Sequence, residues 1–174
     1  MDLAALLQQF SAAVEANDGA GLARLFTADG VYDDYFFGAS QPGAAAIAGM
    51  LAHFYEGGRN FKWEFFDPVV SGSLGYASYR FSYDSTLPDA RGARVMFDGI
   101  SRFELEGGKI KRYAEVFDRG MALAQLDFAA ERLKKVALKY AVRLKARPEA
   151  AGHSRVVAAD FGRRHGGGGR PHSR

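Results

Sequence analysis

The 174-residue chain contains no cysteine. This absence excludes disulfide bonds and thiolate-ligated metal sites, and it permits a reducing compartment. The sequence also lacks a run of about 20 apolar residues, the length that a membrane-spanning helix needs. Its first residues, MDLAALLQQF, have neither a basic segment nor a long apolar run, so they do not resemble a secretory signal peptide. We therefore expect a cytoplasmic protein without a membrane span.

Hydrophobic residues form 48% of the chain and charged residues 25%, which is typical of one globular domain with an ordinary core. With 14 Phe and 8 Tyr, the chain can line a cavity with aromatic rings. The net charge of +3 is unevenly distributed, because residues 1–118 hold 10 Lys+Arg against 16 Asp+Glu while residues 119–174 hold 13 against 4. An acidic body thus carries a basic extension, and nucleic acid is not an expected partner of the body.

Hydrophobic periodicity predicts three helices and then a series of strands. The first helix covers residues 3–16, the second runs through GLARLF and ends near Asp29-Gly30, and the third covers AAAIAGMLAHFYE. A short strand, VYDDYFF, and a loop over residues 38–43 separate the second and third helices. Four longer strands follow, namely FKWEFFDPVV, LGYASYRFSYDS, ARVMFDGISRFELE and KIKRYAEVFD. This order predicts an α+β fold with the helices on one face of an antiparallel sheet.

The basic extension begins with an amphipathic pattern. Residues 126–147 carry an apolar stripe at helical spacing with Lys and Arg elsewhere, which predicts a basic amphipathic helix. We expect this helix to dock on the acidic body or on a partner subunit, with contact to a membrane surface or nucleic acid as alternatives. Residues 148–174 are rich in Gly and Arg and lack periodicity, so we predict a disordered tail. The main domain is thus expected over residues 1–125.

Two adjacent carboxylates, Asp33 and Asp34, lie in the first predicted strand. Because strand side chains alternate between faces, one of the two must point inward. A carboxylate on the inner face of an aromatic strand is costly unless it is paired or has a function. The strand therefore suggests a cavity that contains an acid.

The order of elements, together with LFTADGVYDDYFFG, the helical AHFY and ELEGGKIKRYAEVFD, resembles the nuclear transport factor 2-like superfamily. Within it the chain is most similar to the SnoaL-like branch, which includes ketosteroid isomerases, polyketide cyclases and limonene epoxide hydrolases. The resemblance covers about residues 1–128. It implies a cone-shaped barrel, formed by a strongly bent, mostly antiparallel sheet packed on three N-terminal helices. It also implies a homodimer that associates through the sheet.

The resemblance to the isomerases assigns roles to individual positions. It places their general base at Asp34 and one of their tyrosines at Tyr55, whereas Phe10 and Phe26 replace two other tyrosines. Their protonated aspartic acid falls near Ser101. The two principal oxyanion donors of the isomerases, the tyrosine at Phe10 and the aspartic acid near Ser101, are therefore missing. Because such donors usually provide the largest catalytic contribution, steroid isomerisation is not expected.

The last predicted strand adds a second acid. Alternation and the resemblance both indicate that Tyr113, Glu115 and Phe117 point inward. The resemblance also implies that Glu115 occupies the position of an essential acid of the epoxide hydrolases and of the polyketide cyclases. The Arg and Asp of the epoxide hydrolases correspond to Arg80 and Ser82, which alternation turns outward. The epoxide hydrolase set is therefore incomplete.

These considerations define a predicted site. The candidate catalytic residues are Asp34, Glu115, Tyr55 and Tyr113. The residues expected to line the substrate pocket are Phe10, Phe26, Phe37, Met50, Phe54, Trp63, Tyr79, Phe81, Tyr83, Phe97, Ser101 and Phe117. No cofactor or metal is expected, since no spacing of His, Asp and Glu resembles a metal site.

The predicted function is binding of a small hydrophobic molecule, with cofactor-free acid–base chemistry of the isomerase, cyclase, dehydratase or hydrolase type. A domain that only binds a ligand, or that works as a dimerisation scaffold, is the alternative. The sequence does not define the substrate.

Overall fold

The computed structural model describes residues 2–36, 38–90 and 92–153. It divides into two compact units, Met1–Lys135 and Val136–Arg174, which are described separately. The first unit contains the helices α1 (Leu3–Glu15), α2 (Gly19–Arg24), α3 (Gly43–Gly57) and α4 (Arg119–Ala124). Its strands are β1 (Phe26–Asp34), β2 (Ala39–Pro42), β3 (Gly58–Ser71), β4 (Leu74–Ser85), β5 (Arg94–Glu106) and β6 (Lys109–Phe117).

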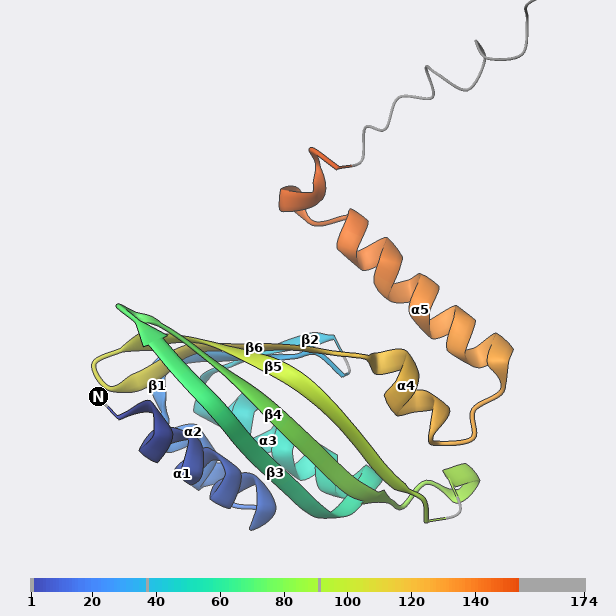
Figure 1. Ribbon diagram of the computed structural model, residues 1–174, viewed down its shortest axis with the longest axis horizontal. Helices are drawn as coiled ribbons and strands as arrows, with labels where there is room; N and C mark the ends of the chain where they lie inside the picture. Colours follow the sequence, from blue (N-terminus) through green and yellow to red (C-terminus); the bar gives the residue numbers. More distant parts are fainter. Residues whose placement is uncertain (1, 37, 91, 154–174) are drawn as a thin grey trace, which may run out of the picture. The chain divides into compact units, whose positions relative to one another are not determined.

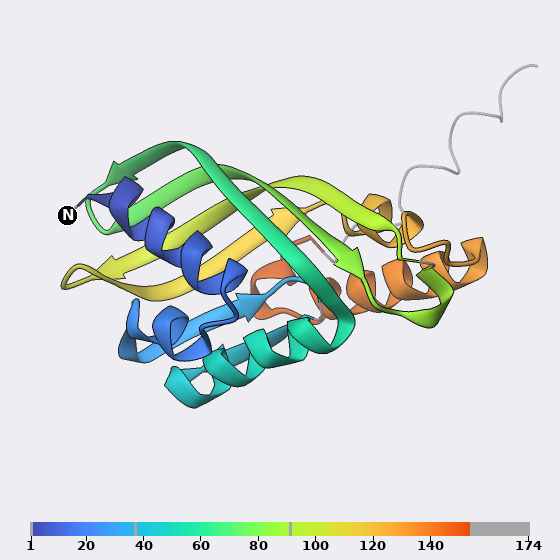
Figure 2. The same ribbon diagram turned by 90° about the horizontal axis from the view of Figure 1, so that it is seen from below.

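The six strands form one curved sheet in the order β2-β1-β6-β5-β4-β3. All neighbours are antiparallel except β1 and β6, which are parallel. Helix α1 packs on β3 and α3 packs on β1, so the N-terminal helices cover one face of the sheet (Figures 1 and 2). The predicted α+β class, with a bent and mostly antiparallel sheet against three N-terminal helices, is confirmed.

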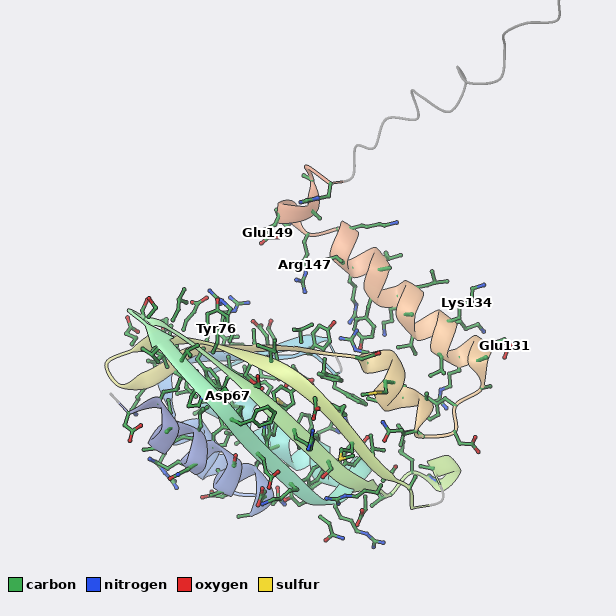
Figure 3. The ribbon with its side chains drawn as sticks, in the orientation of Figure 1. Asp67, Tyr76, Glu131, Lys134, Arg147 and Glu149 are labelled. Atoms are coloured by element: carbon green, nitrogen blue, oxygen red, sulfur yellow. The ribbon has the colours of Figure 1, made fainter. Side chains whose placement is uncertain are left out.

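The bend of the sheet has local causes in β3. The pairing of β3 with β4 shifts register between Arg59 and Lys62 and again between Phe66 and Val69. Inside these two bulges Asn60 and Asp67 adopt positive φ angles of 53° and 52°, and Figure 3 labels Asp67. An extra residue in one strand bends that strand and increases its twist. The longest strand therefore curves around the helices.

Aspartates begin three of the helices. The side chains of Asp2, Asp18 and Asp118 accept hydrogen bonds from the backbone N–H groups at the first turns of α1, α2 and α4. Such a cap satisfies an N–H group that has no partner within the helix, and its loss costs about 1 kcal/mol. Gly107 and Gly108 form the β5–β6 turn with φ angles of 56° and 81°. Two consecutive positive φ angles favour glycine in a two-residue hairpin loop.

Several boundaries differ from the sequence prediction. Helix α2 ends at Arg24 rather than near Gly30, because β1 begins at Phe26, which pairs with Ile110 of β6. The register then shifts, and the pairing resumes at Val31. Strand β1 ends at Asp34, so the two aspartates lie at its end and not in its middle, and Tyr35 follows in a turn. The short strand β2 lies where a loop was predicted, and the short helix α4 was not predicted.

Helix α5 (Ala130–Lys145) begins four residues later than the start of the predicted segment and continues into the second unit. Within that unit the guanidinium of Arg143 lies 5.4 Å from the ring centroid of Tyr140. A short 3-10 helix, Pro148–Ala150, follows. Most of the predicted disordered tail, residues 154–174, lies outside the described residues. In the described part of the chain no helix is long and apolar enough to cross a membrane.

Candidate functional site

Asp34 and Glu115 lie on the neighbouring strands β1 and β6, which run parallel to each other. Tyr32 pairs with Tyr113 across these strands, and Asp34 and Glu115 each lie two residues further along the same face. Asp34 is only 4% exposed, and Glu115 is half-buried. The carboxylate of Asp34 raises the pKa of Glu115, so the two groups interact electrostatically. Asp33 points to the other face, where it accepts hydrogen bonds of 2.5 Å from Ser40 and Arg112.

Glu115 is the group at this site whose ionisation is most strongly perturbed. Burial raises its pKa from 4.5 to about 7. The hydroxyls of Tyr79 and Tyr113 act against this shift by stabilising the carboxylate, Asp34 adds to it, and the positive charge of Arg119 opposes it. A carboxyl group with a pKa near 7 is populated in both protonation states at neutral pH, which suits a general acid or base.

A buried hydrogen-bond chain supports Glu115. The Tyr113 hydroxyl lies 2.9 Å from Oε2 of Glu115, and the Ser101 hydroxyl lies 3.0 Å from the Tyr113 hydroxyl. When Glu115 is ionised it can only accept, so Tyr113 must donate to it and Ser101 must donate to Tyr113. Ser101 and Tyr113 are fully buried, and burial raises the Tyr113 pKa well above 10. The chain therefore fixes the carboxyl group and keeps Tyr113 protonated.

Arg119 carries a positive charge that acts on Glu115, and it was not singled out from the sequence. It begins α4, donates a hydrogen bond to the backbone carbonyl of Tyr35, and places its guanidinium 4.1 Å from the ring centroid of Tyr35. Such a cation–π contact holds the guanidinium near the carboxyl groups. The one available signal was Asp118, a typical N-cap residue followed by a short helix that the sequence analysis did not predict.

The inner face of the sheet beside this cluster is aromatic. Phe10 of α1 is fully buried, and its ring centroid lies 5.3 Å from that of Trp63 and 5.2 Å from that of Tyr113. Phe117, two residues after Glu115 on β6, stacks on Phe97 of β5 with ring centroids 4.2 Å apart. The other predicted pocket residues on this face of β4, Tyr79, Phe81 and Tyr83, are also buried. Alternation along β4, β5 and β6 thus placed these side chains on the correct face.

Other predicted residues lie away from the carboxyl pair. The Tyr55 hydroxyl donates to the carbonyls of Val14 and Glu15, 2.9 and 2.8 Å away, and so ties α3 to the end of α1. Met50 is buried and Phe54 half-buried on the same helix. The structure therefore does not bring Tyr55 together with Asp34 and Glu115.

Two further residues, Phe26 and Phe37, were predicted to line the pocket. Phe26 is buried, with its ring 6.3 Å from that of Tyr32, and it also lines a separate open groove of about 470 Å³. The remaining lining residues of this groove are Ala20, Ala23, Arg24, Thr27, Ala28, Ala44, Ala45, Ala48 and Lys109. It holds no carboxyl group, so it offers none of the acid–base chemistry of the Glu115 cluster. Phe37 lies outside the described residues.

Nothing in the described residues groups three or more His, Cys, Asp or Glu side chains in a way that could hold a metal ion. What the site does offer is a pair of carboxyl groups of different exposure, buried hydroxyl donors and an apolar wall. Neighbouring carboxyls in a poorly solvated site disfavour simultaneous ionisation, so one can act as acid while the other is a base. This arrangement is suited to proton transfer to and from a small, largely apolar molecule.

A profile of the SnoaL-like domain family matches residues 7–113, which is more than half of the chain. The chain therefore belongs to the SnoaL-like domain family. No curated protein matches it.

Solved structures with a similar fold include a protein with a ketosteroid isomerase-like fold from Catenulispora acidiphila DSM 44928, in complex with trimethylamine. It has a TM-score of 0.65 and 20% identity, with 72% of this chain and 95% of that chain covered. A proposed polyketide cyclase from Xanthomonas campestris pv. campestris has a TM-score of 0.59 and 22% identity, covering 71% and 95%. An LEH-like epoxide hydrolase from M. tuberculosis has a TM-score of 0.56 and 18% identity, covering 70% and 86%. At these identities the likeness shows the fold alone.

Proposed function

We propose that this protein binds a small hydrophobic molecule and performs cofactor-free acid–base chemistry on it, of the isomerase, cyclase, dehydratase or hydrolase type. The observation that carries the proposal is the half-buried Glu115, whose pKa is raised to about 7 beside the buried Asp34. Proton transfer by a positioned side chain accelerates reactions by roughly 10²–10⁴, and it works best when the pKa lies near the working pH.

Each group of the cluster has a role in this proposal. Glu115 is partly exposed and exchanges protons with the substrate. The buried Asp34 disfavours ionisation of both carboxyl groups at once, so the pair holds one proton. Tyr113 and Ser101 orient Glu115 through their hydrogen-bond chain. The aromatic residues of β4, β5 and β6 supply an apolar wall in which the electrostatic interactions of the carboxyls are stronger than in water.

The second candidate is a domain that binds a ligand or acts as a scaffold without catalysis. Its support is the close aromatic packing around Phe10, whose ring also contacts those of Phe65 and Phe103 at 5.6 and 6.5 Å. An interior that is filled in this way is stable without any ligand. The two candidates differ in one property, namely whether a molecule that reaches Glu115 exchanges protons with it.

We also propose a homodimer through the outer face of the sheet. Phe66, Ser78, Ile100 and Val116 form one row across β3, β4, β5 and β6, and the three apolar members are 39–53% exposed. Beside this row, Arg80 and Asp98 already pair within the chain through hydrogen bonds of 2.8 and 3.0 Å. An apolar centre with neutralised charges beside it suits a self-complementary two-fold contact.

Catalysis can be tested with two simple probes. Exchange of the α-protons of cyclohexanone in deuterated water reports proton abstraction beside a carbonyl, and hydrolysis of cyclohexene oxide reports acid-assisted ring opening. We expect the wild type to accelerate at least one reaction and Glu115→Gln to lose roughly 10²–10⁴ of that acceleration. Glu106→Gln, which removes an exposed carboxylate at the end of β5, is the matched control.

Two outcomes separate the candidates. Saturable binding of either probe without any reaction favours the ligand-binding alternative. Acceleration that is the same in wild type and Glu115→Gln contradicts the proposed role of Glu115.

A further inference from the structure

The hydroxyl of Tyr79 is a buried donor that is not a member of the hydrogen-bond chain Ser101–Tyr113–Glu115. Tyr79 lies in the middle of β4, is 0% exposed, and its hydroxyl makes no hydrogen bond of good geometry with any described residue. The hydroxyl nevertheless lies close enough to Glu115 to lower the pKa of that carboxyl. The Nε1–H of Trp63, whose ring is 5.2 Å from that of Tyr79, is buried and likewise has no partner among the described residues. Unpaired buried donors are rare, and each costs about 1–3 kcal/mol.

Gly99 determines where Tyr79 lies. Tyr79 is paired with Gly99 across β4 and β5, and a Cβ atom placed on Gly99 would lie 2.4 Å from both the hydroxyl oxygen and Cζ of Tyr79. The end of the tyrosine ring therefore occupies the space that any other side chain at position 99 would fill. Glycine inside a strand often marks such a close approach. The role of Gly99 is steric, since the rigid ring of Tyr79 cannot bend away from a side chain at position 99.

This placement brings the Tyr79 hydroxyl to the carboxyl pair. Gly99 and Ser101 are successive inward positions of β5, and Ser101 is paired with Glu115 on β6. Tyr113 already donates to Glu115 with good geometry at 2.9 Å. The Tyr79 hydroxyl also stabilises the Glu115 carboxylate. Because Tyr113 keeps its hydrogen bond to Glu115, the Tyr79 hydroxyl can turn to a second acceptor beside that carboxyl without leaving it unsupported.

We propose that Tyr79 donates a hydrogen bond to the acceptor oxygen of a neutral substrate beside Glu115, and that Gly99 is the residue that positions it. This inference rests on the proposed function and specifies its substrate class as neutral molecules with an acceptor oxygen, such as ketones, aldehydes or epoxides. The unpaired groups are donors, so the ligand must supply an acceptor, and the nearby carboxyls disfavour an anion. Tyr79 would thus replace the oxyanion donors that are missing at Phe10 and Ser101.

In proton abstraction beside a ketone, the ionised Glu115 takes the proton from the α-carbon. The electron pair of the C–H bond forms the C=C bond, and the π pair of the carbonyl moves to oxygen. The negative charge on this oxygen strengthens the hydrogen bond from Tyr79 in the transition state. Burial raises the pKa of Tyr79 above its usual value, so the group remains a donor at neutral pH.

The experiment compares Tyr79→Phe with Tyr76→Phe, which removes a hydroxyl from the exposed Tyr76 of the same strand (Figure 3). The first readout is α-proton exchange of cyclohexanone, and the second is the infrared stretch of its ¹³C-labelled carbonyl when bound. We expect Tyr79→Phe to lower the exchange rate by roughly 10²–10³ and to shift the carbonyl stretch to higher frequency, because a donor to the oxygen is lost. Tyr76→Phe should change neither.

Gly99→Ala tests the positioning role without removing the hydroxyl. The new methyl group must displace the end of the Tyr79 ring, so the exchange rate and carbonyl stretch should resemble those of Tyr79→Phe. The double variant should be no worse than either single variant, because both remove one interaction. Independent, additive losses in the double variant would show that Gly99 does not act through Tyr79.

The two readouts distinguish failure of this inference from failure of the proposed function. Exchange that is catalysed equally by the wild type and Tyr79→Phe overturns the inference and leaves the proposed function intact. A carbonyl shift that is present in the wild type, lost in Tyr79→Phe and unaccompanied by exchange supports the donor while contradicting catalysis. Absence of both binding and exchange in the folded wild type overturns both.

Discussion

Replacing Glu115 by Gln should change how the stability of the protein depends on pH. Burial raises the pKa of Glu115 from 4.5 in an unfolded chain to about 7 in the folded one. Between these values the folded state keeps a proton that the unfolded state releases. The free energy of unfolding therefore falls as the pH rises through this window, and the contribution is complete below pH 4.5 and lost above pH 7.

The size of the effect follows from the shift. One pKa unit corresponds to 1.36 kcal/mol, so the shift of Glu115 amounts to about 3 kcal/mol between its two limits. Glutamine cannot ionise, but its side-chain carbonyl can still accept the hydrogen bond from Tyr113. We therefore expect the wild type to lose about 3 kcal/mol relative to Glu115→Gln between pH 4.5 and 8.

Urea denaturation of both proteins at several pH values measures this difference directly. Subtracting the two unfolding free energies at each pH cancels the titration of all groups that the substitution leaves unchanged. Glu106→Gln, at an exposed position, provides the baseline for loss of an ordinary surface carboxylate. A difference between wild type and Glu115→Gln that stays constant from pH 4.5 to 8 would refute the raised pKa and with it the acid–base role.

Further predictions concern the core, the outer face and the reaction. Phe10→Ala should lower the free energy of unfolding by about 3–5 kcal/mol in urea denaturation, since Phe10 is fully buried among aromatic rings, and a loss below about 1 kcal/mol would contradict its central place. Ile100→Glu should convert a dimer into a folded monomer in sedimentation equilibrium at micromolar concentration, whereas a wild type that is already monomeric would count against the sheet interface. Turnover of a Δ5-3-ketosteroid should stay near background, and proficient turnover would show that the assignment of Phe10 is incorrect.

The strand pattern allowed the sequence to predict which side chains meet on the inner face. Period-two alternation correctly placed Tyr79 inward and Arg80 outward on β4, and Ser101 inward beside the outward Ile100 on β5. Alternation is reliable here because one face of the sheet is buried, and a shift of one residue would expose its entire apolar set. The inward position of Asp34 follows from the same rule.

The short elements were not predictable in this way. Strand β2, with the sequence ASQP, has no apolar periodicity and exists because it pairs with β1. Residues 27–30 read as the end of a helix, yet they belong to β1, which pairs with β6 on either side of them, at Phe26 and Val31. Such tertiary pairing overrides local propensity.

Details of the site also depend on packing in three dimensions. The separation of Tyr55 from Asp34 and Glu115 follows from the way α3 packs against the end of α1. The contact between Gly99 and Tyr79 depends on the register of two strands, which residue types alone do not reveal. The sequence therefore pointed to both acids and to Tyr79 as a pocket residue, but it gave no sign of the contact with Gly99 or of the donor role that we propose for Tyr79.

The central claim is that Asp34 and Glu115 share one site, and the pKa of Glu115 in the presence and absence of Asp34 tests it most directly. The measurement is a ¹³C NMR titration of the glutamate side-chain carboxyls, with the Glu115 signal assigned from Glu115→Gln. We predict a pKa of about 7 in the wild type and a lower pKa in Asp34→Asn, because removal of the neighbouring negative charge makes ionisation of Glu115 easier. A Glu115 pKa near 4.5 in the wild type, or one that Asp34→Asn leaves unchanged, would contradict the account.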